Sequence, residues 1–399
     1  MQTRLADFIK QTSKGHRADA ILRNCVHCGF CNAVCPTYQL VGDELDGPRG
    51  RIYLIKQLLE GHRATPATQL HLDRCLTCRA CETACPSGVQ YARLLDIGRD
   101  IAEQQVARSW WQRVLRGCMR FWLPYPLRFA KAIAIARGLR FLLPSRLKAK
   151  LPVQAGVPPR PESKHLRQML ILEGCVQPVL APNINAACAQ VLDRLGIGLR
   201  SVEQAACCGA LPYHLDDQVG GLEMMRRLID AWWPQIENGV EAIVISASGC
   251  GVTIKDYGDL LRDDPQYAQK AARVSALAQD IAEILQREDL SRLKVKPRRI
   301  AFHSPCTLQH GQGINGVVEK LLMQLGFTLT AAADAHLCCG SAGAYSILQP
   351  ELAKQLRHAR LEALQAERPE LIATANIGCW QHLQEKAAVP VLHWIELLV

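Results

Sequence analysis

The chain has 399 residues, of which 49% are hydrophobic and 18 are cysteines, and its formal net charge is +10. This composition is typical of globular domains and excludes a largely disordered chain. No stretch is apolar and uncharged over the roughly 20 residues that a membrane-spanning helix needs, so we expect no such helix. The first twenty residues lack the apolar core of a signal peptide, so we expect reduced thiols that bind metal rather than disulfides.

Two cysteine motifs come first along the chain. RNCVHCGFCNAVCPTY (23–38) has the spacing C-x2-C-x2-C-x3-C followed by proline, and RCLTCRACETACPSG (74–88) repeats it. This is the ligand pattern of bacterial two-cluster ferredoxins, in which the fourth cysteine of each motif ligates the other [4Fe–4S] cluster. We therefore predict two clusters, the first held by Cys25, Cys28, Cys31 and Cys85 and the second by Cys75, Cys78, Cys81 and Cys35.

The alternative for these motifs is a pair of zinc sites in a nucleic-acid-binding protein. Zinc sites are usually built from separate C-x2-C pairs, so the doubled four-cysteine pattern favours clusters and no nucleic-acid partner. Between the motifs, Ile52, Ile55 and Leu58 lie on one face of a predicted helix. This insert resembles the helical ferredoxin domain of succinate dehydrogenase-type iron–sulfur subunits. Its GPRGR stretch contains Arg49 and Arg51, which either pack over a cluster, dock a partner or form a solvated helix start.

A basic segment follows, and we assign it to residues 106–162 with its linker. Residues 104–161 hold 12 Lys or Arg and no acid. Trp110, Trp111 and Phe121 recur at helical spacing, with arginines expected on the opposite side, and a second helix is predicted from about 127 to 142. Such helices suit an anionic membrane surface, which we expect to bind 108–150. An acidic partner subunit remains the alternative, and Cys118 is expected in a core.

The C-terminal half reads as two copies of one unit, 163–290 and 291–399, after a ferredoxin-like domain at 1–105. Apolar runs of strand length alternate with helical patterns in each copy, which predicts α/β units with largely parallel sheets. In each copy a cysteine precedes a Cys-Cys-Gly by 32 residues, and another cysteine follows it. The two sets are Cys175, Cys207, Cys208 and Cys250, and Cys306, Cys338, Cys339 and Cys379.

The repeated Cys…CCG…Cys pattern resembles the cysteine-rich domain of heterodisulfide reductase subunits. The order of double ferredoxin motif, basic linker and two CCG units resembles the family of iron–sulfur subunits of bacterial glycolate oxidase, over nearly the whole chain. Related subunits belong to anaerobic glycerol-3-phosphate dehydrogenase and to lactate-utilisation systems, which stay as alternatives. The resemblance implies a helical ferredoxin domain before a duplicated α/β domain, in an α+β multidomain chain.

The family resemblance also implies a function. Its members pass electrons from a flavoprotein that oxidises a 2-hydroxy acid or polyol phosphate toward membrane quinone. We expect the basic segment to hold such a complex against the cytoplasmic face of the inner membrane. No G-x-G-x-x-G follows a predicted strand and no acid–base pair stands out, so we expect the substrate site on partner subunits and no catalytic residue here.

The CCG units depart from the full family pattern, in which each unit ends in C-x2-C. Ala247 and Asn376 stand where the first of those cysteines is expected. Four thiolates suffice for a cubane [4Fe–4S] cluster, so these sets could hold one or two further clusters, and a metal-free pocket is the alternative. His303 is expected beside the Cys306 site or at a strand end, and Cys188 is read as a bystander.

Overall fold

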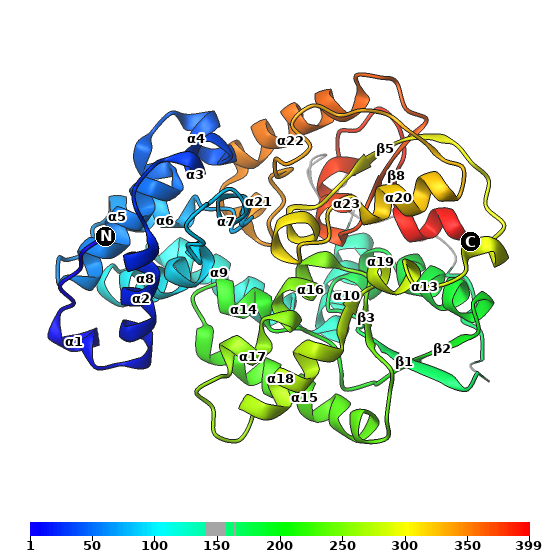
Figure 1. The fold of residues 1–399 in the computed structure, drawn as a ribbon, viewed down its shortest axis with the longest axis horizontal. Coiled ribbons are helices and arrows are strands. Elements are labelled where there is room, and N and C mark those ends of the chain that lie inside the picture. Colours follow the sequence, from blue (N-terminus) through cyan, green and yellow to red (C-terminus); the bar gives the residue numbers. More distant parts are fainter. Residues whose placement is uncertain (140–156, 163–164) are drawn as a thin grey trace. The chain divides into compact units, whose positions relative to one another are not determined.

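The computed structural model describes residues 1–139, 157–162 and 165–399 (Figure 1). The chain forms two compact units, Met1–Leu115 with Asp334–Arg360, and Arg116–Ala333 with Leu361–Val399. The segment 334–360 belongs by sequence to the second CCG copy, yet it packs with the N-terminal unit. The domain limits inferred from the sequence therefore differ from the compact units at this segment.

The N-terminal unit is built from helices. The helix predicted between the cysteine motifs is confirmed, because α5 buries Ile52, Ile55 and Leu58. α8 crosses it closely, since a Cβ on Gly98 would lie 2.5 Å from Ile55 Cγ1. The helices are α1 (Asp7–Lys10), α2 (Ser13–Asn24), α3 (Phe30–Ala33), α4 (Pro36–Val41), η1 (Glu44–Asp46), α5 (Pro48–Leu59), α6 (Pro66–Asp73), α7 (Ala80–Thr83), α8 (Tyr91–Gln105) and α21 (Tyr345–Leu348), with α22 (Pro350–Gln365) running out of the unit.

The second unit contains two four-stranded sheets with the strand orders β2-β1-β3-β4 and β6-β5-β7-β8. Every strand pair in them is parallel, as the alternation of strands and helices predicted. The first sheet contains β1 (Arg167–Ile171), β2 (Ile197–Ser201), β3 (Ile243–Ile245) and β4 (Ala278–Asp280), and the second contains β5 (Arg299–His303), β6 (Thr328–Leu329), β7 (Leu371–Thr374) and β8 (Val391–His393).

Helices cover both sheets and complete the repeated architecture. They are α12 (Gln177–Leu180), α13 (Asn183–Arg194), α14 (Ala210–His214), α15 (Gln218–Glu237), α16 (Ser248–Lys255), α17 (Tyr257–Leu260), α18 (Ala268–Leu277), α19 (Ile281–Leu285), η3 (Leu290–Arg292), η4 (Thr307–Gly311), α20 (Val317–Gln324), α23 (Ile377–Gln384) and η5 (Trp394–Leu398). The matching strand orders confirm that the α/β half is a duplication.

The two copies share one hydrophobic core. A single cluster joins Val244 of the first sheet to Ile300 and Leu371 of the second. Hydrogen bonds also connect the two copies. The Ser248 N–H of the first copy donates to the Ala375 carbonyl of the second (3.2 Å), and Ser248 Oγ lies 2.7 Å from Thr307 Oγ1. The sheets therefore form one body, and loops from both copies are held in register.

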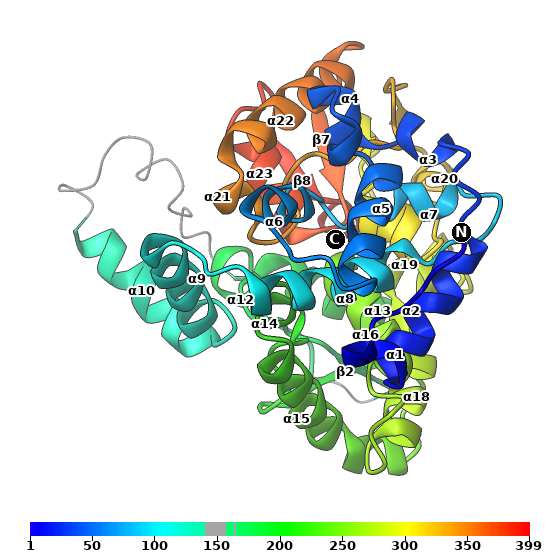
Figure 2. The ribbon, with the colours of Figure 1, turned by 90° about the vertical axis from the view of Figure 1, so that its left-hand side faces the viewer.

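The basic segment folds as α9 (Trp110–Trp122) and α10 (Pro126–Gly138), two successive helices joined by a short turn (Figure 2). The predicted division of α9 into an aromatic side and an arginine side is present, and the structure adds which side packs on the protein. Arg116 is buried and its Nη1 lies 2.8 Å from Asp216 Oδ2, and Arg120 donates to the Leu215 carbonyl (3.3 Å). Arg116 and Arg120 therefore pack against protein, while Arg113, one turn earlier, is exposed.

The apolar side of α9 is turned outward instead. Trp110, Trp111, Val114 and Phe121 are all exposed, and Cys118 on the same face is exposed rather than in a core as predicted. The remainder of the predicted basic segment, 140–156, lies outside the described residues. In the described part of the chain, no helix is long and apolar enough to cross a bilayer.

Candidate iron–sulfur sites

Two cavities lie at the cysteine motifs. The first encloses about 440 Å³ of non-protein space, part of it open to solvent. Its walls include Cys85 from the second motif together with the first three cysteines of the first motif, Cys25, Cys28 and Cys31. The structure thus brings together the four thiols predicted for the first cluster.

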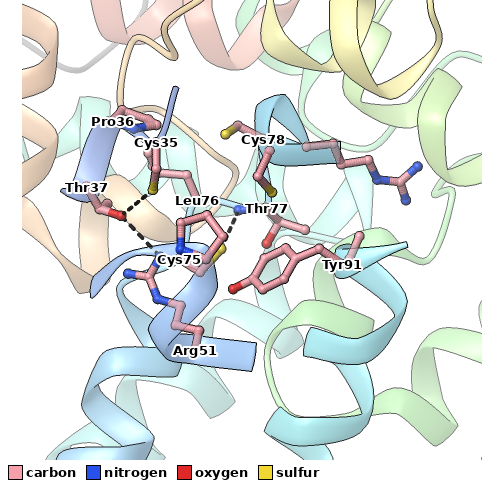
Figure 3. Close-up of a pocket in the computed structure, with 13 residues that line it drawn as sticks. Cys35, Pro36, Thr37, Arg51, Cys75, Leu76, Thr77, Cys78 and Tyr91 are labelled. Carbon is pink, nitrogen blue, oxygen red and sulfur yellow. Dashed lines mark hydrogen bonds between the residues drawn. The ribbon is translucent and has the colours of Figure 1, made fainter. Parts of the chain in front are cut away.

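The second cavity encloses about 360 Å³ on the same measure (Figure 3). Cys35 from the first motif meets Cys75, Cys78 and Cys81 here, which is the predicted crossed set. Cys81 lines both cavities, so the two sites share a wall. Sites that share a wall are close enough for direct electron exchange between their contents.

Both motifs use the same backbone conformation to aim their thiols. The φ angle is positive at His27 and Gly29 in the first loop and at Thr77 and Arg79 in the second. Left-handed residues at alternating positions curve the chain so that its N–H groups point into the concave side of the loop. Such a loop suits an anionic group, such as an iron–sulfur cluster with its thiolate ligands. In the second loop the Thr77 N–H donates to Cys75 Sγ at 3.4 Å.

The thiols themselves fit a cationic metal. Burial and, less strongly, the charge of the nearby Cys25 raise the pKa of Cys31 to about 11. Burial likewise raises the pKa of Cys81, followed by the charges of Cys78 and Cys75. Several buried thiolates are unfavourable without a counter-charge, and iron supplies that charge while deprotonating its ligands. The donor set therefore matches iron–sulfur ligation.

A buried arginine lies beside the second cavity. The side chain of Arg51 is 1% exposed, and its Nη1 donates to Thr37 Oγ1 at 3.1 Å. Thr37 Oγ1 in turn lies 3.3 Å from Cys35 Sγ (Figure 3). Burial lowers the pKa of Arg51, but the charges of Cys75, Tyr91 and Cys35 outweigh burial and raise it overall. Packing over a cluster was one of the predicted roles of Arg49 and Arg51, whereas Thr37 was missed because no spacing rule marks it.

The first CCG set forms a second kind of thiol cluster. Hydrogen bonds with Cys175 and Cys208 raise the pKa of Cys207. Hydrogen bonds from Cys207 and Cys250 lower the pKa of Cys208, so all four thiols form one connected group. They lie after β1, β2 and β3, at the carboxyl ends of parallel strands where α/β sheets place their sites.

The backbone at the third position of each CCG requires glycine. Gly209 has φ +78°, and a Cβ there would lie 2.6 Å from the Gly221 carbonyl oxygen. Gly340 has φ +89°, with the Ala353 carbonyl oxygen at 2.8 Å. Each glycine N–H donates at 3.5 Å to the sulfur two residues earlier. Only glycine tolerates both the conformation and the close approach.

The second CCG set is divided between the two compact units. Cys306 and Cys379 follow β5 and β7 in the α/β unit, while Cys338 and Cys339 precede α21 in the N-terminal unit. Within the α/β unit, a ring nitrogen of the fully buried His303 lies within 4.8 Å of Cys379 Sγ. His303 therefore lies near a cysteine of the second CCG set, which agrees with the predicted placement beside this site.

The two copies differ in polarity at matching positions. His303 and Leu172 each lie three residues before the first cysteine of their set. Asn376, at one of the missing cysteine positions, donates to Cys379 Sγ at 3.8 Å, whereas its counterpart in the first copy is Ala247. The second copy thus surrounds its sulfur with donors that the first copy lacks.

Tyr345 was missed by the sequence reasoning. Its side chain is buried, and burial raises the pKa of its hydroxyl, followed by the charge of Cys75 and, more weakly, that of Cys338. Both cysteines belong to the same compact unit as Tyr345. The pKa of the buried Tyr345 hydroxyl therefore depends on charge at Cys75 of the second ferredoxin site and at Cys338 of the second CCG pair.

Comparison with known proteins places these sites in a family. Residues 21–89 match the 4Fe-4S dicluster domain, and residues 169–255 and 300–384 match the cysteine-rich domain CCG. The chain is 55% identical over its full length to the glycolate oxidase iron-sulfur subunit of Escherichia coli (strain K12), of which the match covers 98%.

Two further relatives are more distant. The probable glycolate oxidase iron-sulfur subunit of Bacillus subtilis (strain 168) is 30% identical over 93% of this chain and 90% of its own. One subunit of the fumarate reductase (CoM/CoB) of Methanothermobacter marburgensis is 24% identical over 94% of this chain and 72% of its own. The cysteine-lined cavities and these matches together identify an iron–sulfur protein with [4Fe–4S] clusters in its N-terminal domain. The chain belongs to the family of glycolate oxidase iron–sulfur subunits.

Proposed function

We propose that this chain is the electron-transfer subunit of a glycolate-oxidising complex, in which it accepts electrons from a flavoprotein partner and passes them toward membrane quinone. The observation that carries the proposal is the pair of cysteine-lined cavities that share Cys81. Bound [4Fe–4S] clusters supply one-electron transfer at these sites. The chain supplies the crossed ligand sets, Cys25, Cys28, Cys31 and Cys85 for one cluster and Cys75, Cys78, Cys81 and Cys35 for the other.

The direction of the route is part of the proposal. Cys75, which lines the second cavity, and Cys338 belong to the same compact unit as Tyr345, and the charge of each raises the pKa of the buried Tyr345 hydroxyl. We therefore place the exit of electrons from the ferredoxin domain at the second cavity. The four thiols of each CCG set are proposed as ligands of a further cluster, for the second set on the strength of the repeat.

The function is tested by anaerobic purification and by turnover. We expect a brown protein with iron and acid-labile sulfide, which restores electron transfer from glycolate to a quinone analogue when combined with the flavoprotein partner. A colourless protein that holds only zinc would contradict the proposal. Lactate utilization protein A of several Bacillus species is 24–26% identical over 56% of this chain, so lactate and glycerol 3-phosphate are tested as competing substrates.

The outward face of α9 and α10 is proposed to bind the cytoplasmic surface of the inner membrane. Trp110, Trp111, Phe121 and Leu127 are exposed together on these two helices. Arg128 stacks on the Phe121 ring, with its guanidinium carbon 4.4 Å from the ring centre, so charge and apolar surface alternate there. Exposed aromatic side chains beside cations, with no acid in the segment, favour an anionic lipid interface.

This membrane proposal predicts a vesicle-binding defect. Changing both Trp111 and Phe121 to Ser removes two side chains worth about 1.5–3 kcal/mol each on burial, so binding falls about 100-fold or more. The measurement is sedimentation with vesicles of phosphatidylglycerol and phosphatidylcholine. Phe8→Ser, which removes an exposed aromatic ring from α1, is the control and should bind normally. Unchanged binding by the double variant would assign α9 to a partner subunit.

A further inference from the structure

The first turn of α5 carries one arginine for each cavity. Arg49 lines the first cavity and Arg51 lines the second, while Pro48 lines both. Residues two positions apart on an α-helix point about 200° apart, so the helix start separates the two sites and presents a cation to each. The two cations differ in their surroundings, and this difference carries the inference.

Arg49 is a compensated and hydrated cation. Its side chain is 37% exposed, and its Nε lies 2.6 Å from Glu44 Oε1. Its guanidinium lies against the first loop, because a Cβ on Gly29 would be 2.7 Å from Arg49 Nη1. The field that it adds at the first cavity is therefore reduced by the Glu44 carboxylate and screened by water.

Arg51 is buried and lines the second cavity, whereas its counter-ion Asp46 does not line it. Its guanidinium lines the second cavity and donates to the His71 carbonyl (2.7 Å) and to Thr37. Asp46, which is fully buried, lies 3.4 Å from Arg51 Nη2 but does not line that cavity. Asp46 also accepts from Arg74 at 2.8 Å, so its charge is shared between two arginines.

Further charged groups lie near this cavity: Arg79 also lines it, Arg99 donates to the Cys75 carbonyl (2.9 Å), and the charge of Glu82 acts on Cys81. Asp43 lies in the same group as Asp46 and His71, but it is exposed, so water screens its carboxylate. A buried cation next to a redox centre is screened far less than an exposed one. The second cavity therefore carries a more positive local field than the first.

We propose that Arg51 makes the cluster held by Cys35, Cys75, Cys78 and Cys81 the higher-potential member of the pair, so that an electron entering the ferredoxin domain comes to rest there. The step is a one-electron reduction, with the electron supplied by the flavoprotein partner. Reduction adds one negative charge at the site, and the Arg51 cation stabilises that charge. The proposal deepens the proposed function and rests on its crossed ligand sets.

Cys75 and Cys338 belong to the same compact unit, so an electron held at the second cavity stays in the unit that contains the second CCG pair. The arginine pair then acts as a directional element.

The test is a redox titration of the anaerobically purified full chain, followed by electron paramagnetic resonance. Cys28→Ser and Cys78→Ser assign each reduction wave to one cavity, and the wave at higher potential should be the one lost in Cys78→Ser. Arg51→Gln should lower that wave by at least a tenfold change in its equilibrium, which is 59 mV for a one-electron couple. Arg49→Gln is the matched control and should shift the other wave by less.

Two further variants separate charge from a structural role. Arg51→Lys keeps the cation and should retain most of the potential, while Asp46→Asn removes the opposing charge and should raise the same wave. A loss of packing would not move the potential in opposite directions in Arg51→Gln and Asp46→Asn. If both variants hold full iron and leave the wave unmoved, the charge proposal is overturned.

The outcomes for the ligands and for the arginine are read separately. If Cys28→Ser and Cys78→Ser remove the same wave, the crossed ligand sets of the proposed function fail. If they remove different waves but the one lost in Cys78→Ser lies lower, the assignment of one cluster to each cavity stands and the role of Arg51 fails. If Arg51→Gln binds too little iron to titrate, Asp46→Asn decides alone, and an unshifted or lowered wave there overturns the proposal.

Discussion

The Cys78→Ser variant should lose about four irons per chain and at least about 99% of the electron transfer from glycolate to quinone. Cys78 lines the second cavity only, so the first cavity keeps its four thiols. Electron transfer should then stop between the cluster of the first cavity and the CCG units. Reduction of the flavin by glycolate should persist in the partner, because the proposed function assigns that chemistry to the partner. Iron analysis, rapid-mixing absorbance and quinone reduction measure the three effects.

Cys118→Ser is the matched control for this variant. Cys118 is an exposed thiol on α9 that lines neither cavity, so its replacement tests the effect of losing any one cysteine. It should keep full iron and full transfer. Normal quinone reduction by Cys78→Ser would show that electrons bypass the second cavity, and it would refute the proposed route.

The ferredoxin sites were predicted in most of their detail because their determinants are local. The spacing within Cys25–Cys35 and Cys75–Cys85 specifies two loops of the same conformation, and each proline begins or follows a short turn. The crossing of Cys35 and Cys85 follows from the same pattern. By contrast, Thr37, Asp46 and Tyr345 have no spacing signal, because their positions depend on how helices from distant segments pack.

The orientation of α9 shows a second limit of sequence reasoning. Helical periodicity reveals that one face is apolar and the other basic, but it does not say which face is buried. Arg116 finds its ion-pair partner in Asp216, one hundred residues further along the chain. That contact inverts the usual arrangement and leaves the aromatic face outward. The inversion strengthens the reason to expect a partner surface for α9, since two tryptophans and a phenylalanine stay exposed.

The duplication was visible in the cysteine spacing, yet the two copies have diverged in chemistry. The strand orders of the two sheets match, and the CCG glycines adopt the same conformation. The first site is bordered by Leu172 and Ala247, and the second by His303 and Asn376. Polar donors near sulfur raise cluster potentials. A sequence repeat alone shows the shared ligands and not this difference.

The first CCG set should bind metal, and Cys208→Ser should reveal it. Cys208 lies at the centre of the group, in contact with Cys207 and Cys250, and it carries the thiol with the lowered pKa. A lowered pKa favours the thiolate that ligates iron. We expect the native chain to hold more than about eight irons, and the variant to hold about four fewer than the native chain.

The control for Cys208→Ser must be a cysteine that is equally buried but not clustered. Cys188 meets this need, because it is fully buried in the core that the two copies share, and burial raises its pKa, which keeps the thiol protonated and inert. Cys188→Ala should therefore keep all its iron, even if it loses some stability through the cavity it leaves. Equal iron in the native chain and in Cys208→Ser would mean that the first CCG group is a thiol pocket without metal. Loss of iron in Cys208→Ser alone would show that four cysteines are enough for this family's site, since Ala247 supplies no fifth ligand.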